Sequence, residues 1–232
     1  MSNYPTESEA KVVAAAERLM VETMARYDPS HDAFHVQRVR KTALHIARTL
    51  VDSPPSPDAR PPDLLTVELA ALLHDVLDKK YVSAEQAADP YAFFLPFFEE
   101  AKMASGLDLV EDGRAAAIAK IVTNVSWSTE KKLREAGRIE AWHRECLELH
   151  CVQDADRLDA IGAFGLMLFA RPLYAPVCDP MQPNTAIQHF YDKLLHIHEQ
   201  LKTDIGKQLA EKRHQLMLTF LTAVDDEYAA KA

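Results

Sequence analysis

Leu69-Ala70-Ala71-Leu72-Leu73-His74-Asp75 is the stretch of sequence that decides the fold. Five apolar residues in succession predict a helix buried in a core, and a histidine and a carboxylate follow directly. Adjacent helical residues point about 100° apart, so His74 and Asp75 can share a small ion only if that ion lies against the helix. A lone His-Asp pair is common, and this one gains meaning from His31-Asp32-Ala33-Phe34-His35 upstream and Asp154-Ala155-Asp156-Arg157 downstream.

Length and composition favour one large helical domain. A chain of 232 residues is long enough to bury a sizeable core, and six glycines leave little material for hairpin turns. The net charge of −9 argues against a partner with a phosphate backbone, such as a nucleic-acid polymer. It is compatible with a small anionic substrate, because local cations or a metal can hold one.

The sequence predicts a cytoplasmic protein without a membrane partner. No apolar run approaches the roughly 20 residues that span a bilayer, and the N-terminus lacks a basic-then-apolar signal pattern. The three cysteines, Cys146, Cys151 and Cys178, form no CxxC pair, so we expect no disulfide framework.

Apolar periodicity predicts an all-α fold, a single domain over residues 1–232 with its core at about 30–165. We expect helices at residues 6–27, 33–50, 63–78, 112–125, 185–202 and 204–228, and one or two helices within 145–169. Thr6 and Glu9 have the spacing of a capping box, and Asp63 is suited to cap the third helix. The proline-rich segment 53–62 should be an exposed loop.

Proline and glycine mark the remaining helical region. Pro90 and Pro96 are expected to divide residues 83–105 into two short helices, because proline removes a backbone donor. Gly106 should close this region as a C-cap.

Four side chains can be assembled into one site: His35, His74, Asp75 and Asp156. Two imidazoles and two carboxylates suit a divalent ion of intermediate hardness and leave coordination positions for water or substrate. Each residue taken alone is more often a surface, capping or ion-paired group than a ligand. Asp156 lies among apolar residues, where an ionised carboxylate needs a partner.

The order His35, then His74-Asp75, then Asp156 resembles the H…HD…D pattern of the HD-domain metal-dependent phosphohydrolases. The likeness extends to the subgroup of small stand-alone HD proteins of the YedJ and YpgQ type, and it covers residues 30 to 228. Four segments carry it: HDAFHVQRV (31–39), AALLHDVLDK (70–79), QDADRLDAIGA (153–163) and HFYDKLL (189–195).

This resemblance implies an HD-domain helical bundle with one divalent metal held by the four residues above. Manganese, magnesium, iron, cobalt, nickel and zinc are all compatible with the donor set. The implied reaction is hydrolysis of a small phosphorylated substrate, often a nucleotide. The nearest reaction type splits a nucleoside triphosphate into the monophosphate and pyrophosphate, and nucleotide phosphatase activity is a related one.

One metal is expected rather than two. Dinuclear members of the superfamily use further histidines between the HD pair and the last aspartate, whereas this chain has none between Asp75 and His143. His143 and His150 could supply a second ion, and with Cys146 they have a helical spacing that also suits zinc. Exposed and core-edge histidines at such spacing are common, so both ideas carry less weight.

Supporting roles can be assigned around these ligands. The groups expected to position water or transfer a proton are Asp78, His31 and Asp32. The cations expected to offset phosphate charge are Lys79, Lys80, Arg38, Arg157 and Lys193. Each is more often a surface charge when taken alone, and Lys193 leads because it lies in the HFYDKLL segment.

Asp154 and Asp159 are expected to support the ligands by orienting them, and a substrate contact is the alternative role for Asp154. If Asp154 rather than Asp156 were the ligand, the alignment to the family would shift by two positions.

Other classes of function stay open at this point. A redox-iron HD-domain oxygenase would need further ligands, which the intervening chain lacks. A non-catalytic HD-fold binding protein would be expected to have lost ligands, and all four are present. The apolar terminal helices allow either a homodimer or packing within one chain.

Overall fold

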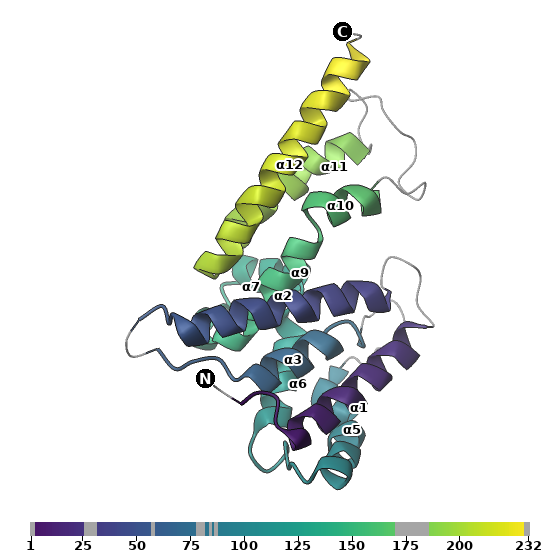
Figure 1. The fold of residues 1–232 in the computed structure, drawn as a ribbon, viewed down its shortest axis with the longest axis vertical. Coiled ribbons are helices and arrows are strands. Elements are labelled where there is room, and N and C mark those ends of the chain that lie inside the picture. The colour runs from purple at the N-terminus through teal and green to yellow at the C-terminus, as the bar shows by residue number, and fades with distance from the viewer. Residues whose placement is uncertain are drawn as a thin grey trace. The chain divides into compact units, whose positions relative to one another are not determined.

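The computed structural model describes residues 3–25, 32–56, 59–77, 82–83, 85, 88–169 and 186–229. All regular secondary structure in these ranges is helical, which confirms the all-α prediction (Figure 1). No helix in the described ranges is both long and apolar enough to cross a bilayer. The chain divides into two compact units, Met1–Gln153 and Asp154–Ala232. The predicted single domain and its core limits stay a prediction.

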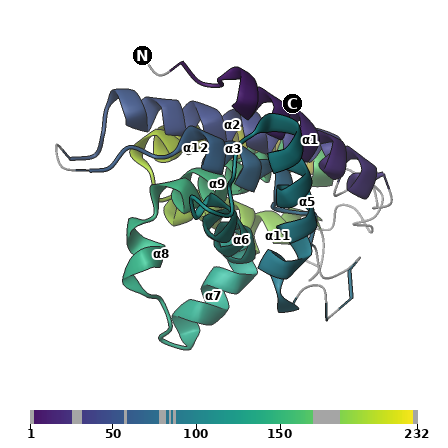
Figure 2. The same cartoon turned by 90° about the horizontal axis from the view of Figure 1, so that it is seen from below.

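The first unit is built around α3, whose ten residues are all buried. α3 packs against α1, α2 and α6, and α5 in turn covers α1 and α6 (Figures 1 and 2). A helix whose apolar residues lie on all its faces must be surrounded in this way. Its helices are α1 (Glu7–Met24), α2 (Ala33–Asp52), α3 (Leu64–Leu73), α5 (Pro90–Ser105), α6 (Arg114–Asn124), α7 (Trp127–Glu135), α8 (Ala141–Glu145) and the start of α9 (Leu147–Asp159).

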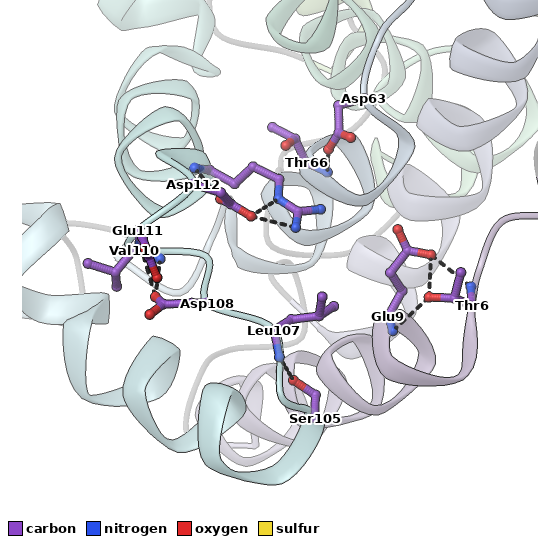
Figure 3. A network of polar contacts seen from close by, with 11 residues as sticks. Thr6, Glu9, Asp63, Thr66, Ser105, Leu107, Asp108, Val110, Glu111 and Asp112 are labelled. Carbon is purple, nitrogen blue, oxygen red and sulfur yellow. Dashed lines mark hydrogen bonds and ion pairs between the residues drawn. The ribbon is translucent and has the colours of Figure 1, made fainter.

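Two helix starts follow the local sequence as predicted (Figure 3). Thr6 and Glu9 form a complete capping box at α1. Asp63 caps α3 by accepting a 2.7 Å hydrogen bond from the backbone N–H of Thr66. These caps satisfy backbone donors that have no partner inside the helix.

The end of α3 differs from the prediction. The helix was expected to continue to about residue 78, but it ends at Leu73, and residues 74–77 form a turn. The His74 ring donates to the carbonyl oxygen of Ala71, which a continuing helix would offer to a later backbone N–H. The backbone N–H of Val76 then bonds Leu73 in a tighter turn. His74 and Asp75 therefore lie in the turn that follows α3 and not within the helix.

The expected break at Pro96 is also wrong, because α5 is continuous from Pro90 to Ser105. Pro90 stands in the first turn, where its missing N–H costs nothing. Pro96 loses one helical hydrogen bond, and burial of Phe94 and Phe98 offsets that loss. Gly106 closes α5 in the left-handed region with φ of 77°, as predicted.

The second unit contains the end of α9, α10 (Gly162–Phe169), α11 (Ala186–Asp192), the 3₁₀ helix η2 (Leu194–Gln200) and α12 (Asp204–Tyr228). α12 packs against α10 and η2, and α11 packs against η2. The sequence predicted one helix over 185–202. It is divided because Lys193, with φ of −138° and ψ of −55°, leaves the helical conformation.

Candidate metal centre

His35 is presented by the first turn of α2. Asp32 caps this helix and accepts a 2.8 Å hydrogen bond from the backbone N–H of His35. Val36 and Val39 are fully buried and anchor the same turn of the helix in the core. Asp32 therefore holds the backbone of His35, a role that local capping explains without chemistry.

His74 is held in one tautomer. Its Nδ1 lies 2.8 Å from the carbonyl oxygen of Ala71, which can only accept, so Nδ1 carries the proton. In the neutral imidazole, Nε2 then carries the lone pair that a metal needs. The His74 side chain is only 2% exposed, because it follows directly on the buried helix α3.

Asp75 brings the two histidines into one group. Its Oδ2 lies 3.5 Å from His35 Nε2 and 3.4 Å from His74 Nε2. The two imidazole rings meet edge to face, with centroids 5.4 Å apart. Ligand atoms at about 2.1 Å from an ion are about 3.0 to 3.4 Å apart at octahedral or tetrahedral angles.

This donor set fits a divalent cation. The ligating atoms of His35, His74 and Asp75 all lie within 4.8 Å of one another, and no other such group occurs in the part of the chain that the structure describes. The His35 and Asp75 side chains are 16% and 19% exposed, so the group is accessible from solvent. The structure thus brings together three of the four predicted ligands.

Asp156, the fourth, lies half-buried in the part of α9 that belongs to the second unit, and its role as a ligand stays a prediction. Asp154 is fully buried, and its carboxylate accepts hydrogen bonds from Lys202 N, Thr203 N and Thr203 Oγ1 at 2.8, 2.8 and 2.7 Å. Burial raises the pKa of Asp154, and these hydrogen bonds oppose that shift. Both Asp154 oxygens are thus engaged within the second unit, and the choice of Asp156 over Asp154 as the ligand stays a prediction.

The predicted cations lie in different environments. Arg157 is only 4% exposed, and its Nη1 donates a 2.7 Å hydrogen bond to the carbonyl oxygen of Gln200. Lys193 is exposed at the start of η2, and Arg38 is half-buried one turn beyond His35 on α2. Asp159 is buried near Arg213. Burial lowers the pKa of Arg213, and the negative charge of Asp159 partly opposes that shift. Their roles toward substrate or ligands stay predictions.

Four predicted residues lie outside the described ranges: His31, Asp78, Lys79 and Lys80.

The histidines of the alternative second-ion or zinc site, His143 and His150, make hydrogen bonds within the fold. His143 Nδ1 accepts from the backbone N–H of Glu140, and its Nε2 donates to Asn124 Oδ1, both at 3.2 Å. His150 Nε2 donates to the carbonyl oxygen of His143 at 2.9 Å. These bonds tie α9 to the preceding segments within the first unit, and the structure does not support a metal there.

One buried group was missed by the sequence reasoning. Glu68 lies in α3 with its side chain 5% exposed, paired with Arg40 of α2. A single charged residue in the otherwise uncharged run 64–73 was the available signal, because a buried carboxylate needs a partner.

No protein-family model matches the chain. Bacillus subtilis YpgQ is 31% identical to it over 209 residues, which cover 85% of this chain and 84% of YpgQ. The crystal structure of YpgQ in complex with ADP has a TM-score of 0.65 and 25% identity over 95% of this chain and 96% of that chain. The crystal structure of an HD-superfamily hydrolase from Bacillus thuringiensis has a TM-score of 0.68 and 25% identity, and covers 96% of this chain and 100% of that chain.

The similarity to YpgQ, in sequence and in structure, extends over most of the chain. It confirms the resemblance that the four sequence segments indicated. The chain belongs to the YpgQ-like family of the HD superfamily.

Proposed function

We propose that the chain is a metal-dependent phosphohydrolase that acts on a small phosphorylated substrate, with nucleotides as the favoured class. The observation that carries this proposal is the convergence of His35, His74 and Asp75, with both imidazole Nε2 atoms within 3.5 Å of one carboxylate oxygen. The similarity to an HD-superfamily hydrolase supports hydrolysis as the type of reaction.

The ligands would be His35, His74, Asp75 and, as the fourth, Asp156. When bound, a divalent ion acidifies water and neutralises phosphate charge. Ala71 fixes the His74 tautomer through its carbonyl oxygen, and Asp32 fixes the backbone of His35. This preorganisation lets the site bind an ion without rearranging its first two helices.

Cations of this chain would bind the phosphate groups. Arg38 lies three residues beyond His35, and helical residues at that spacing share a face. Lys193 is solvent-exposed at the junction of α11 and η2, so its ammonium group is available to a phosphate. Lys79 and Lys80 are further candidates, and Asp78 or His31 would position water or transfer a proton.

A nucleotide is the favoured substrate because the related YpgQ was crystallised with ADP. Two reactions fit such a substrate, release of pyrophosphate from a nucleoside triphosphate and release of phosphate from a nucleotide. They are distinguished by their products.

The test is metal reconstitution. The full chain is stripped of metal, reloaded separately with Mn²⁺, Mg²⁺, Co²⁺ or Zn²⁺, and incubated with a panel of nucleotides while ³¹P NMR follows the products. We expect release of pyrophosphate or phosphate that depends on added metal. A metal-loaded protein that hydrolyses none of these substrates would contradict the proposal.

A further inference from the structure

The buried carboxylate of Glu68 in α3 is bound by two side chains from other parts of the chain. Glu68 Oε1 accepts from Arg40 Nε at 2.7 Å and lies 2.5 Å from Arg40 Nη2. Glu68 Oε2 accepts from the hydroxyl of Tyr4, which lies 64 residues earlier in the chain. Burial and the neighbouring Glu68 carboxylate raise the pKa of Tyr4, so its hydroxyl keeps its proton and remains a donor.

Arg40 extends this contact to α1. Its Nη1 lies 3.0 Å from Glu17 Oε2 and donates to Gln37 Oε1 at 3.3 Å. The Gln37 amide in turn donates to Glu17 Oε1 at 2.7 Å. The N-terminal segment, α1, α2 and α3 are thereby joined through one guanidinium group.

The network lies on the two helices that present the metal-site residues. Arg40 follows His35 by five residues on α2, and Glu68 lies on α3 six residues before His74, which directly follows the end of that helix. At 1.5 Å per residue these separations are about 7.5 and 9 Å along the helix axes. A helix is rigid over one or two turns, so a shift of α2 against α3 at the ion pair would move His35 relative to Asp75.

We propose that the Arg40–Glu68 pair, completed by Tyr4, is a positioning device for the metal centre. It holds α2 and α3 at the register that places His35 Nε2 within 3.5 Å of Asp75 Oδ2. This inference rests on the proposed metal site and adds residues that do not touch the ion.

The chemistry of the pair favours positioning over stability alone. Apolar residues of similar volume can replace a buried ion pair with little loss of stability, whereas an arginine fork imposes direction on its carboxylate partner. Removing Arg40 leaves the buried Glu68 carboxylate with the Tyr4 hydroxyl but without its cation. Removing Glu68 leaves Arg40 with Glu17 and Gln37. Either change costs the pair's main electrostatic contact. Stability and register can therefore be separated by comparing single and double variants.

The experiment measures Co²⁺ affinity and the visible spectrum of the Co²⁺-loaded full chain, together with thermal unfolding of the metal-free chain. The variants are Glu68→Gln, Arg40→Met and the double variant Arg40→Met/Glu68→Met. Phe98→Leu on α5, a fully buried position remote from the pair in sequence, is the control for lost stability. All affinities are measured at a temperature where each variant is folded.

We expect each single variant to unfold at lower temperature and to bind Co²⁺ about tenfold more weakly, the lower end of the effect of groups that orient ligands. The double variant should regain thermal stability while its affinity and spectrum stay altered. Phe98→Leu should lose stability and keep both the affinity and the spectrum.

The opposite results would overturn the proposal. A double variant with the parent affinity and spectrum would show that the pair only stabilises the fold. If Glu68→Gln does not fold, Tyr4→Phe, which keeps the ion pair, should weaken Co²⁺ binding severalfold, and an unchanged affinity would count against positioning. A His74→Ala variant that still binds Co²⁺ would instead refute the metal site itself.

Discussion

His74 donates its Nδ1 proton to the carbonyl oxygen of Ala71, one turn earlier in the chain. This bond lies where α3 ends at Leu73, fixes the tautomer of the imidazole and leaves its Nε2 beside Asp75. The residue that follows the end of the buried helix α3 is therefore also a candidate ligand of the metal centre.

Replacing His74 should abolish metal binding. His74→Ala removes a nitrogen donor from a group whose ligating atoms lie within 4.8 Å of one another, and the ligands that remain should hold an ion poorly. After dialysis, the metal content of the variant should fall from stoichiometric to background, as measured by inductively coupled plasma mass spectrometry. His143→Ala, which alters a histidine bonded to Asn124, should retain metal. Equal metal content in the two variants would refute the ligand assignment.

Replacing Lys193 should weaken substrate use and leave the metal in place. The exposed ammonium is expected to contact phosphate, and losing such a charge should lower kcat/KM at least about tenfold, or 1.4 kcal/mol. Steady-state kinetics with the best nucleotide substrate and a metal assay on the same sample provide the measurement. Lys212→Ala, an exposed lysine on α12, is the matched control. Loss of metal from Lys193→Ala would contradict its assigned role.

A methyl group at Gly206 should destabilise the protein. A Cβ there would lie 2.4 Å from Asp154 Oδ2 and 2.8 Å from Thr203 Oγ1, closer than van der Waals contact allows. Gly206→Ala should therefore lower the free energy of unfolding by about 1–3 kcal/mol. Urea denaturation measures this loss, and Gln208→Ala, an exposed neighbour on α12, should change it by less than about 0.5 kcal/mol. An unchanged midpoint for Gly206→Ala would be inconsistent with this close approach.

Cys146 should react slowly with alkylating reagents at pH 8. Burial raises the pKa of its thiol to about 11, and the neighbouring Glu148 carboxylate adds to the shift. The reactive thiolate is then scarce below pH 11, so the alkylation rate should rise about tenfold per pH unit up to that value. Mass spectrometry of the peptide that contains Cys146 gives the rate, with the urea-unfolded chain as the fast reference.

The same shift has a defined effect on stability. The folded thiol keeps its proton while an unfolded one loses it near pH 9, so the folded state binds more protons between pH 9 and 11. The free energy of unfolding should fall across this window. For Cys146→Ser it should fall less steeply with pH. Parallel pH profiles for the two proteins would exclude a raised pKa at Cys146.

The sequence by itself determined the features that depend on neighbouring residues. The cap at Asp63, the capping box of Thr6 and Glu9 and the left-handed Gly106 all formed as predicted, because each needs contacts within a few residues. The metal-site residues of the first unit were likewise indicated by their order in the chain.

Only the tertiary structure decided the features that depend on distant segments. The Arg40–Glu68 pair joins residues 28 apart, and Asp154 binds Thr203 across 49 residues. Pro96 stays helical because α5 buries its aromatic side chains, and burial is not visible in local spacing. Such contacts form when apolar surfaces are removed from water, and the buried polar groups must then find partners wherever the packed helices place them.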